Sequence, residues 1–312
     1  MNRIPLLYKA GLLKNILYLI LIITLSTIVI LSIGVIIPII FMGNDFVVNL
    51  TKLGEINNPD IISLNKYVQI LSQIGMFIVP ALFFAYLANV NISSYLRINR
   101  KVSVGIVLLG GLAMLAAFPF INRMAEWNSM MKLPSFMSGI EQWMKESEEK
   151  GRIITETFLN TSSLSGFLVN FIMIAVLAGL GEEFLFRGVI QKLFYDKIKN
   201  PHIAIIIAAF IFSAIHMQFY GFLPRFLMGI YLGYLFYWTG SIWTSVFAHL
   251  LNNGTAVVVS FLNNRKVINF DPDAIGTQST SVIYLIASVI LMTGFIYYIK
   301  QKSMKINCGE II

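Results

Sequence analysis

The sequence predicts an all-α fold, a polytopic membrane helical bundle of about eight transmembrane helices. Hydrophobic residues make up 57% of the 312 positions and charged residues only 12%, against roughly 25% charged in a soluble domain. Only helices and closed barrels satisfy their backbone groups inside lipid. The apolar runs are about 20 residues long, which is the length of a helix that crosses a bilayer and about twice that of a barrel strand.

Eight apolar segments follow one another along the chain. We expect spans over residues 16–42, 68–89, 102–121, 164–197, 202–219, 222–238, 242–262 and 281–299. The first segment is too long for the core of a signal peptide and has no small-residue cleavage site. Asn200-Pro201 separates the fourth span from the fifth, because proline ends helices. The whole chain, 1–312, is therefore expected to form a single membrane domain.

Residues 122–163 differ from the rest and are expected to form a loop outside the membrane. Within this loop, residues 135–150 show helical spacing, with Ser135 placed to cap the helix and Gly151 placed to stop it. One interpretation is an amphipathic helix that lies on the membrane near a substrate entrance. The other is a loop helix packed on the bundle, and the sequence leaves both open.

Charge distribution indicates location and partners. The net charge is +8, but Lys and Arg lie in short loops between apolar segments, which argues against nucleic acid as a partner. The positive-inside rule places both termini in the cytoplasm, and we expect a multi-pass protein of the plasma membrane with membrane lipid around it. The basic N-terminal flank consists of Arg3, Lys9 and Lys14. The single Cys308 excludes an intramolecular disulfide and a cysteine metal cluster.

The apolar segments also hold ionisable and polar residues at membrane depth. Such groups cost several kcal/mol even on lenient scales, so they face a partner or a water-filled cavity. They are Glu182, Glu183, Arg187, His216, His249 and Asn253. If the fourth and fifth spans form a hairpin that turns at Lys199, Glu182 and His216 lie at similar depth, because each is 17 residues from the turn. His249 and Asn253 are spaced i, i+4 and share one helix face.

These residue types suit hydrolysis of an acyl bond. A buried carboxylate beside a histidine can hold and deprotonate a water molecule. A second histidine and an amide can stabilise the oxyanion of a tetrahedral intermediate. Alternatively, Glu182, His216 and His249 could ligate zinc with one position open. The cofactor is thus either none or a divalent metal such as zinc, and the H-E-x-x-H and G-x-S-x-G motifs are absent.

Three spacings carry a resemblance to a known family. Glu182-Glu183-x-x-x-Arg187, Phe212-x-x-x-His216 and His249-x-x-x-Asn253 resemble the three motifs of the CPBP family. These are the CAAX-protease and bacteriocin-processing intramembrane endopeptidases, also called Abi proteins, some of which are described as metalloendopeptidases. The resemblance covers residues 164–262, which would form the catalytic core.

The resemblance implies a role for each motif residue and a peptide or protein substrate. Glu182 would be the general base and would act with His216 on the attacking water. His249 and Asn253 would stabilise the oxyanion, while Glu183 and Arg187 would support the site as an ion pair. Two other classes stay open: a proton-coupled transporter, which also carries intramembrane Glu, His and Arg, and a non-catalytic membrane scaffold or immunity protein.

Overall fold

The computed structural model of this chain describes residues 6–7, 11–89, 91–278, 280 and 282–306. Residues 304–306 are described by their backbone only. Arg3, Lys9 and Cys308 lie outside the described residues. Within the described ranges the chain forms helices and connecting turns and no strand. The predicted all-α class is therefore confirmed.

The helices of the first half form an N-terminal pair and a bent pair, followed by a separate helix. They are α1 (Leu12–Met42), α2 (Asn44–Leu50), α3 (Pro59–Gln73), the π-helical segment η1 (Ile74–Ile78), α4 (Val79–Ala88), α5 (Ile92–Tyr95), α6 (Val104–Ala116), α7 (Phe118–Ser129), the 3₁₀ turn η2 (Ser135–Met137) and α8 (Ser138–Leu159).

The second half contains the motif-bearing helices. They are α9 (Leu164–Asn170), the π-helical segment η3 (Phe171–Leu177), α10 (Ala178–Leu185), the π-helical segment η4 (Phe186–Gln191), α11 (Lys192–Ile198), α12 (Pro201–Ala214), α13 (Phe222–Thr239), α14 (Ile242–Asn264), the 3₁₀ turn η5 (Pro272–Ala274) and α15 (Val282–Ile306).

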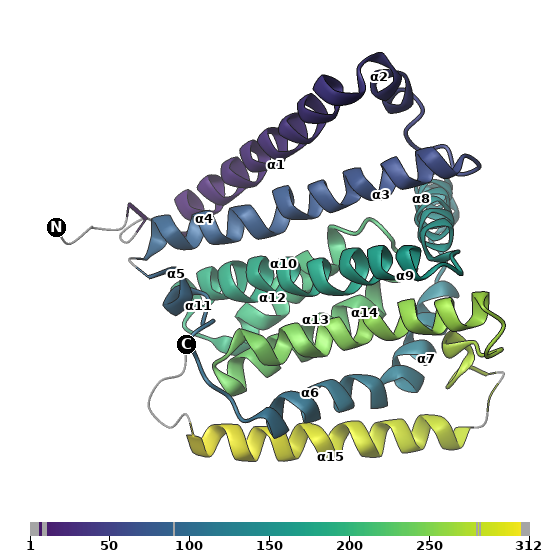
Figure 1. The fold of residues 1–312 in the computed structure, drawn as a ribbon. Helices are drawn as coiled ribbons and strands as arrows, with labels where there is room; N and C mark the ends of the chain where they lie inside the picture. Colours follow the sequence, from purple (N-terminus) through teal and green to yellow (C-terminus); the bar gives the residue numbers. More distant parts are fainter. Residues whose placement is uncertain (1–5, 8–10, 90, 279, 281, 307–312) are drawn as a thin grey trace.

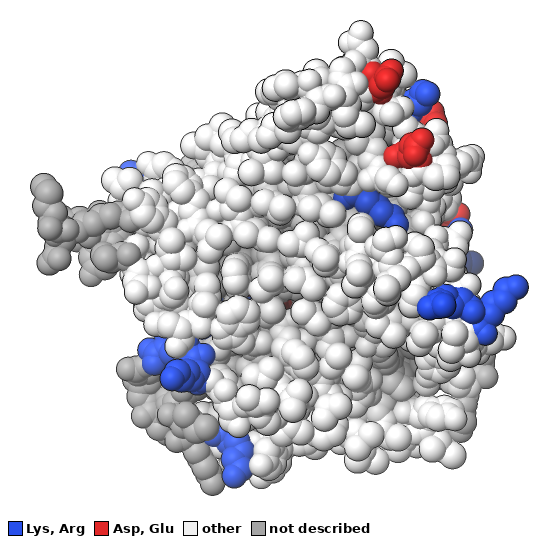
Figure 2. Space-filling model, in the orientation of Figure 1, with Lys and Arg blue, Asp and Glu red and all other residues white. Residues whose placement is uncertain are grey.

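The long helices lie side by side in one bundle, and α8 crosses one end of it. In Figure 1, α1 begins and α15 ends at the same end of the bundle, while α8 lies at the opposite end. Charged side chains gather towards the two ends of the face shown in Figure 2, and the broad middle is almost free of them. This distribution is typical of a protein with an apolar belt in contact with lipid.

Judged by helix length and composition, the described helices could cross a membrane fewer times than the eight predicted. Five helical stretches are long and apolar enough: Leu12–Met42, Pro59–Ala88, Leu164–Ile198, Ile242–Asn264 and Val282–Ser303. A sixth is possible if α6 and α7, which meet at an angle of 42°, form one broken span. Each of the eight predicted segments is mainly helical, but α12 has only 14 residues and α13 carries Arg225 in its first turns. Eight crossings are therefore not confirmed, whereas a multi-pass membrane protein is supported.

Several boundaries differ from the prediction, each for a local reason. The second predicted span, 68–89, begins earlier than predicted, because the Asn58 side chain accepts a hydrogen bond from the backbone N–H of Asp60 and starts α3 at Pro59. The predicted span 102–121 breaks at Ala117, where Pro119 enters the first turn of α7. The predicted span 202–219 ends at Ala214, and Met217 adopts a left-handed backbone conformation with φ of 54°.

The helix of the 122–163 segment is longer than predicted. α8 continues past Gly151 to Leu159, and α7 already covers residues 118–129. Gly151 is not a stop signal; a Cβ atom there would lie 2.3 Å from Nε2 of Gln218, so the glycine allows close contact with another part of the chain. α8 packs on the turn after α12 through Trp143, whose ring centre lies 5.2 Å from that of Phe219. Phe136, Ile140 and Trp143 each remain partly exposed on the segment that begins at η2.

Candidate functional site

α10 carries the two adjacent carboxylates and is flanked on both sides by π-helical turns. The segment η3 ends just before Ala178, and η4 begins at Phe186. Such turns are rare in proteins as a whole but recur at functional sites. Because neighbouring helix residues point about 100° apart, Glu182 and Glu183 face different surroundings. Glu183 is fully buried between helices, whereas Glu182 borders two cavities.

Glu183 and Arg187 form the predicted ion pair inside the bundle. Nη1 of Arg187 donates to Oε1 of Glu183 at 2.6 Å, and both side chains are almost wholly buried. Nη2 of Arg187 donates to the carbonyl oxygen of Gly229 at 3.0 Å, and the guanidinium carbon lies 4.8 Å from the centre of the Phe212 ring. A buried cation needs this full set of partners, because an unpaired charge at this depth is strongly destabilising.

A second side-chain-to-backbone hydrogen bond lies one turn further along the same helices. Nε2 of Gln191 donates to the carbonyl oxygen of Gly233 at 3.2 Å, so Arg187 and Gln191 repeat one pattern against Gly229 and Gly233. A Cβ atom at Gly229 would lie 3.1 Å from the Cα atom of Ala209. The two glycines therefore let α12, α13 and η4 approach closely, as small residues do in membrane bundles.

His249 connects the two carboxylates. Its Nδ1 lies 2.9 Å from Oε1 of Glu183, and because an ionised carboxylate only accepts, Nδ1 carries the hydrogen. Its Nε2 faces Oε2 of Glu182 at 3.8 Å, which is too long for a hydrogen bond. The Glu183–His249 contact was not predicted, since the two residues are 66 positions apart and spacing within one helix gives no signal for it.

His216 is fixed by its own helix. It lies just after the end of α12, and its Nδ1 is 2.8 Å from the carbonyl oxygen of Phe212. A carbonyl oxygen only accepts, so Nδ1 again carries the hydrogen. In the neutral ring, Nε2 is then the lone-pair nitrogen and can accept a proton. In the Phe212-x-x-x-His216 motif, the carbonyl oxygen of Phe212 therefore sets the tautomer of the His216 ring four residues later.

Asn253 is oriented by two hydrogen bonds. Its Nδ2 donates to the carbonyl oxygen of Ile174 at 3.0 Å, and its Oδ1 accepts from Nδ2 of Asn252 at 3.1 Å. One hydrogen of the Asn253 amide stays outside these contacts, because Nδ2 has two. Asn252 was not among the predicted site residues, although its adjacency to Asn253 in an apolar helix was a visible signal.

Four of the six predicted residues border one polar cavity of about 260 Å³. Glu182, His216, His249 and Asn253 line it together with Asn252 and Arg225, and its remaining walls are Met114, Ile121, Phe212, Pro224 and Met228. Glu183 and Arg187 do not line the cavity and lie behind His249. Sequence reasoning missed Arg225, which lies near the start of α13 and has no recognised motif spacing.

A larger, mostly apolar cavity of about 640 Å³ lies on the other side of Glu182 and His216. Both residues line it as well as the polar cavity. Its other walls come from α1, α3, η1 and α10 to α12: Ile16, Leu19, Ile20, Ile23, Gln69, Gln73, Met76, Phe77, Leu185, Phe186, Ile190, Leu193, Phe194, Ile211 and Ile215. Glu182 and His216 therefore stand where an apolar chamber meets a polar one.

The turn that carries His216 is held from two sides. Arg225 donates to the backbone carbonyl and to the side-chain oxygen of Gln218, at 3.0 and 2.6 Å. From α8, Ser147 donates to the carbonyl oxygen of Met217 at 2.8 Å, and Glu148 accepts from the backbone N–H of Tyr220 at 3.1 Å. α8 thus positions the turn beside the polar cavity.

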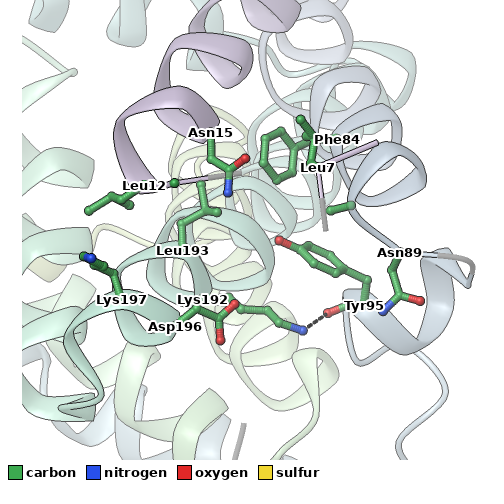
Figure 3. Close-up of a pocket in the computed structure, with 12 residues that line it drawn as sticks. Leu7, Leu12, Asn15, Phe84, Asn89, Tyr95, Lys192, Leu193, Asp196 and Lys197 are labelled. Atoms are coloured by element: carbon green, nitrogen blue, oxygen red, sulfur yellow. Dashed lines mark hydrogen bonds between the residues drawn. The ribbon is translucent and has the colours of Figure 1, made fainter. Parts of the chain in front are cut away.

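A third cavity, of about 450 Å³, lies at another place and borders none of the six predicted residues (Figure 3). It lies where the start of α1 and the end of α4 meet α5 and α11. Nζ of Lys192 lies 3.5 Å from the carbonyl oxygen of Tyr95 and 4.2 Å from the centre of its ring. These contacts tie α11 to α5 and explain why a lysine is tolerated inside this end of the bundle.

The structure brings together no set of metal ligands among the residues that it describes: no three His, Cys, Asp or Glu side chains gather closely enough to hold a metal ion. The ligand set of Glu182, His216 and His249 considered from the sequence is therefore not assembled in this arrangement. Nδ1 of both histidines donates to protein, which leaves Nε2 as the ring nitrogen of each that can face a ligand.

Comparison with known proteins gives one match. A family model described as type II CAAX prenyl endopeptidase, Rce1-like, matches residues 164–255. No curated protein and no solved structure matches the chain. The match runs from the start of α9 into α14 and contains all six predicted site residues. The predicted resemblance to the CPBP family is confirmed.

Proposed function

We propose that this chain, whose residues 164–255 are Rce1-like and mark it as a membrane protease, hydrolyses a peptide bond with a water molecule activated by Glu182 and His216. The observation that carries the proposal is that both residues line the junction between the apolar and the polar cavity. A substrate with a hydrophobic part and a polar reacting bond would place that bond beside them.

Water activation is assigned to the two groups that can accept a proton there. Glu182 makes no hydrogen bond to another described side chain, and the neutral ring of His216 presents Nε2 as an acceptor because Phe212 holds the hydrogen of Nδ1. Water attacks the carbonyl carbon, and its proton passes to Glu182 or to Nε2 of His216. The same proton then goes to the leaving amine when the C–N bond breaks.

The oxyanion is assigned to His249 and Asn253. Asn253 offers the amide hydrogen that is not bonded to Ile174, and His249 offers Nε2–H when its ring carries both protons. Glu183 orients that ring because its carboxylate accepts from Nδ1. Donors held in place before the reaction are worth more in a dry site than in water.

The family description suggests a lipidated peptide as substrate. The apolar cavity has walls of isoleucine, leucine and phenylalanine and suits a hydrophobic chain of this kind.

The proposal extends to the organisation of the whole chain. Residues 1–312 form one membrane domain, with 164–262 as its catalytic core and 122–163 as the loop that carries α8. The protein is assigned to the plasma membrane, and the excess of Lys and Arg in the short loops supports an orientation with both termini in the cytoplasm.

Cleavage by purified protein tests the proposed hydrolysis. Wild-type protein and the variants Glu182→Gln and His216→Gln are incubated in lipid nanodiscs with a peptide that carries an S-farnesyl cysteine near its C-terminus and with the same peptide without the lipid. We expect a loss of about 10²-fold or more in each variant, because general acid–base groups contribute that much. Glu156→Gln, on the exposed face of α8, is the matched control.

Three results would contradict the proposal. Cleavage that is undiminished in Glu182→Gln would remove its central residue. Proton-coupled flux without hydrolysis would favour the transporter class. An unchanged cellular phenotype in both site variants would favour a scaffold or immunity protein.

A further inference from the structure

One buried side-chain oxygen in the wall of the apolar cavity has no hydrogen-bond partner among the described residues. Gln73, the last residue of α3, is 8% exposed. Its Oε1 is buried and makes no hydrogen bond within the described part of the chain. It lines the same cavity as Glu182 and His216, although it lies 91 positions before the Rce1-like segment begins. Family motifs therefore give no role to this residue.

Packing prevents this part of the chain from moving away from the site. A Cβ atom at Gly75 would lie 2.9 Å from the Cα atom of Thr27 in α1, and Oγ of Ser26 donates to the Gly75 carbonyl oxygen at 2.6 Å. On the opposite side, a Cβ atom at Gly181 would lie 2.9 Å from Cβ of Phe77. The π-helical segment η1, which follows Gln73 directly, is thus held between α1 and α10, next to Glu182.

A buried carboxamide oxygen without a partner is unfavourable in this position. Leaving a polar atom unsatisfied costs about 1–3 kcal/mol, and a hydrophobic side chain of similar size would suit a wall of Met76, Phe77 and Ile215 better. Gln69 lies one turn earlier on the same face, lines the same cavity and is exposed. The two glutamines therefore present carboxamides in the wall of the cavity that Glu182 also lines.

We infer that Gln73 binds the backbone of the peptide substrate beside the scissile bond, its carboxamide turning towards the cavity so that Oε1 accepts from a peptide N–H. A carboxamide offers both an acceptor and donors, and a peptide group offers one of each, so the two groups can pair. In a chamber with apolar walls, such a contact fixes the depth of an extended peptide without selecting its side chains. Gln73 is then a substrate-positioning residue contributed by the second long helix. This inference deepens the proposed function and rests on it for the identity of the ligand as substrate.

Binding can be measured apart from cleavage. Full-length Glu182→Gln protein in nanodiscs is titrated into a fluorescein-labelled peptide with one S-farnesyl cysteine and a free C-terminus, and anisotropy gives Kd. Gln73→Met is then added to the Glu182→Gln background. In a parallel series of peptides, each backbone N–H near the cysteine is replaced in turn by an ester oxygen.

We expect Gln73→Met to weaken binding by about 5- to 30-fold, which corresponds to one hydrogen bond to a desolvated group. One ester peptide should lose a similar factor against protein that retains Gln73 and should lose nothing further against the Gln73→Met protein. The two changes should therefore be non-additive at one position of the peptide, which a general loss of packing would not produce. The melting temperature of Gln73→Met should stay equal or rise.

The matched control removes a glutamine that lies away from the cavity. Gln142 is exposed on α8, where its Nε2 donates to Oε1 of Glu146 at 3.0 Å. Gln142→Met in the Glu182→Gln background should bind the unmodified peptide with unchanged Kd. Its affinity for the ester peptide should fall by the same factor as that of the Glu182→Gln protein, since Gln73 is retained.

Each other outcome has a defined meaning. Three outcomes would each overturn the inference. They are equal affinity of the Glu182→Gln protein with and without Gln73→Met, additive effects across the whole ester series, and no binding of the peptide at all. If the coupling is present but wild-type protein cleaves nothing, the peptide site stands and the proposed hydrolysis fails. If cleavage occurs without the coupling, the hydrolysis stands and the assignment of Gln73 fails.

Discussion

Oε1 of Glu183 accepts hydrogen bonds from two groups at once, Nη1 of Arg187 at 2.6 Å and Nδ1 of His249 at 2.9 Å. One carboxylate oxygen therefore joins α14 to the π-helical turn after α10. The second of the two adjacent glutamates is a structural centre of the site, whereas the first borders the cavities. This division separates the expected effects of substitutions at the two positions.

Removing Glu183 should destabilise the protein more than removing Glu182. Glu183→Ala leaves Arg187 buried without its counter-ion, which costs about 3–5 kcal/mol, while Glu182→Ala removes a side chain without an ion-pair partner inside hydrogen-bond distance. Thermal unfolding in nanodiscs measures the difference. The double variant Glu183→Leu/Arg187→Met should recover part of the loss, since no charge is then left unpaired; a double variant less stable than Glu183→Ala would contradict this account.

Asn252 should affect catalysis through Asn253. Asn252→Leu removes the donor to Oδ1 of Asn253, so the Asn253 amide can rotate away from the oxyanion position. We expect kcat to fall by roughly 5-fold with a smaller change in KM, since a hydrogen bond of this kind contributes about 1 kcal/mol. Asn252→Gln, which retains a donor, should recover part of kcat. A change in KM alone would argue against positioning.

Gly151 should matter for activity although it lies outside the Rce1-like segment. In Gly151→Ala the new methyl group meets the Gln218 side chain, which Arg225 holds beside the turn that carries His216. We expect reduced cleavage with little loss of helix stability. Gly139→Ala on the same helix is the matched control, because a Cβ atom there has no neighbour within 4 Å. Equal activity of the two variants would show that α8 does not act on the turn.

Chelators should leave cleavage unchanged. The described side chains offer no group of three His, Cys, Asp or Glu close enough to hold a metal ion. Activity is measured before and after dialysis against EDTA and 1,10-phenanthroline, together with the metal content of the purified protein. A loss of activity that zinc restores would instead support a metalloendopeptidase with Glu182, His216 and His249 as ligands.

Much of this protein could be predicted from composition and local spacing. Long uncharged runs have few ways to satisfy their backbone in lipid, so the all-α membrane class follows from them directly. The i, i+4 spacings indicated two relationships in advance: the ion pair of Glu183 with Arg187 and the shared face of His249 and Asn253. These are relationships within one helix, where 3.6 residues per turn decide which side chains meet.

Tertiary packing decided what lies between helices. Three features join distant parts of the chain. Glu183 accepts a hydrogen bond from His249, Gln73 and Arg225 line the cavities, and α8 supports the turn that carries His216. Helix ends were also decided there, as at Gly151, where contact with Gln218 and not helix termination explains the glycine. Periodicity specifies the face that a residue occupies, but only the rotation and depth at which helices pack specify what that face meets.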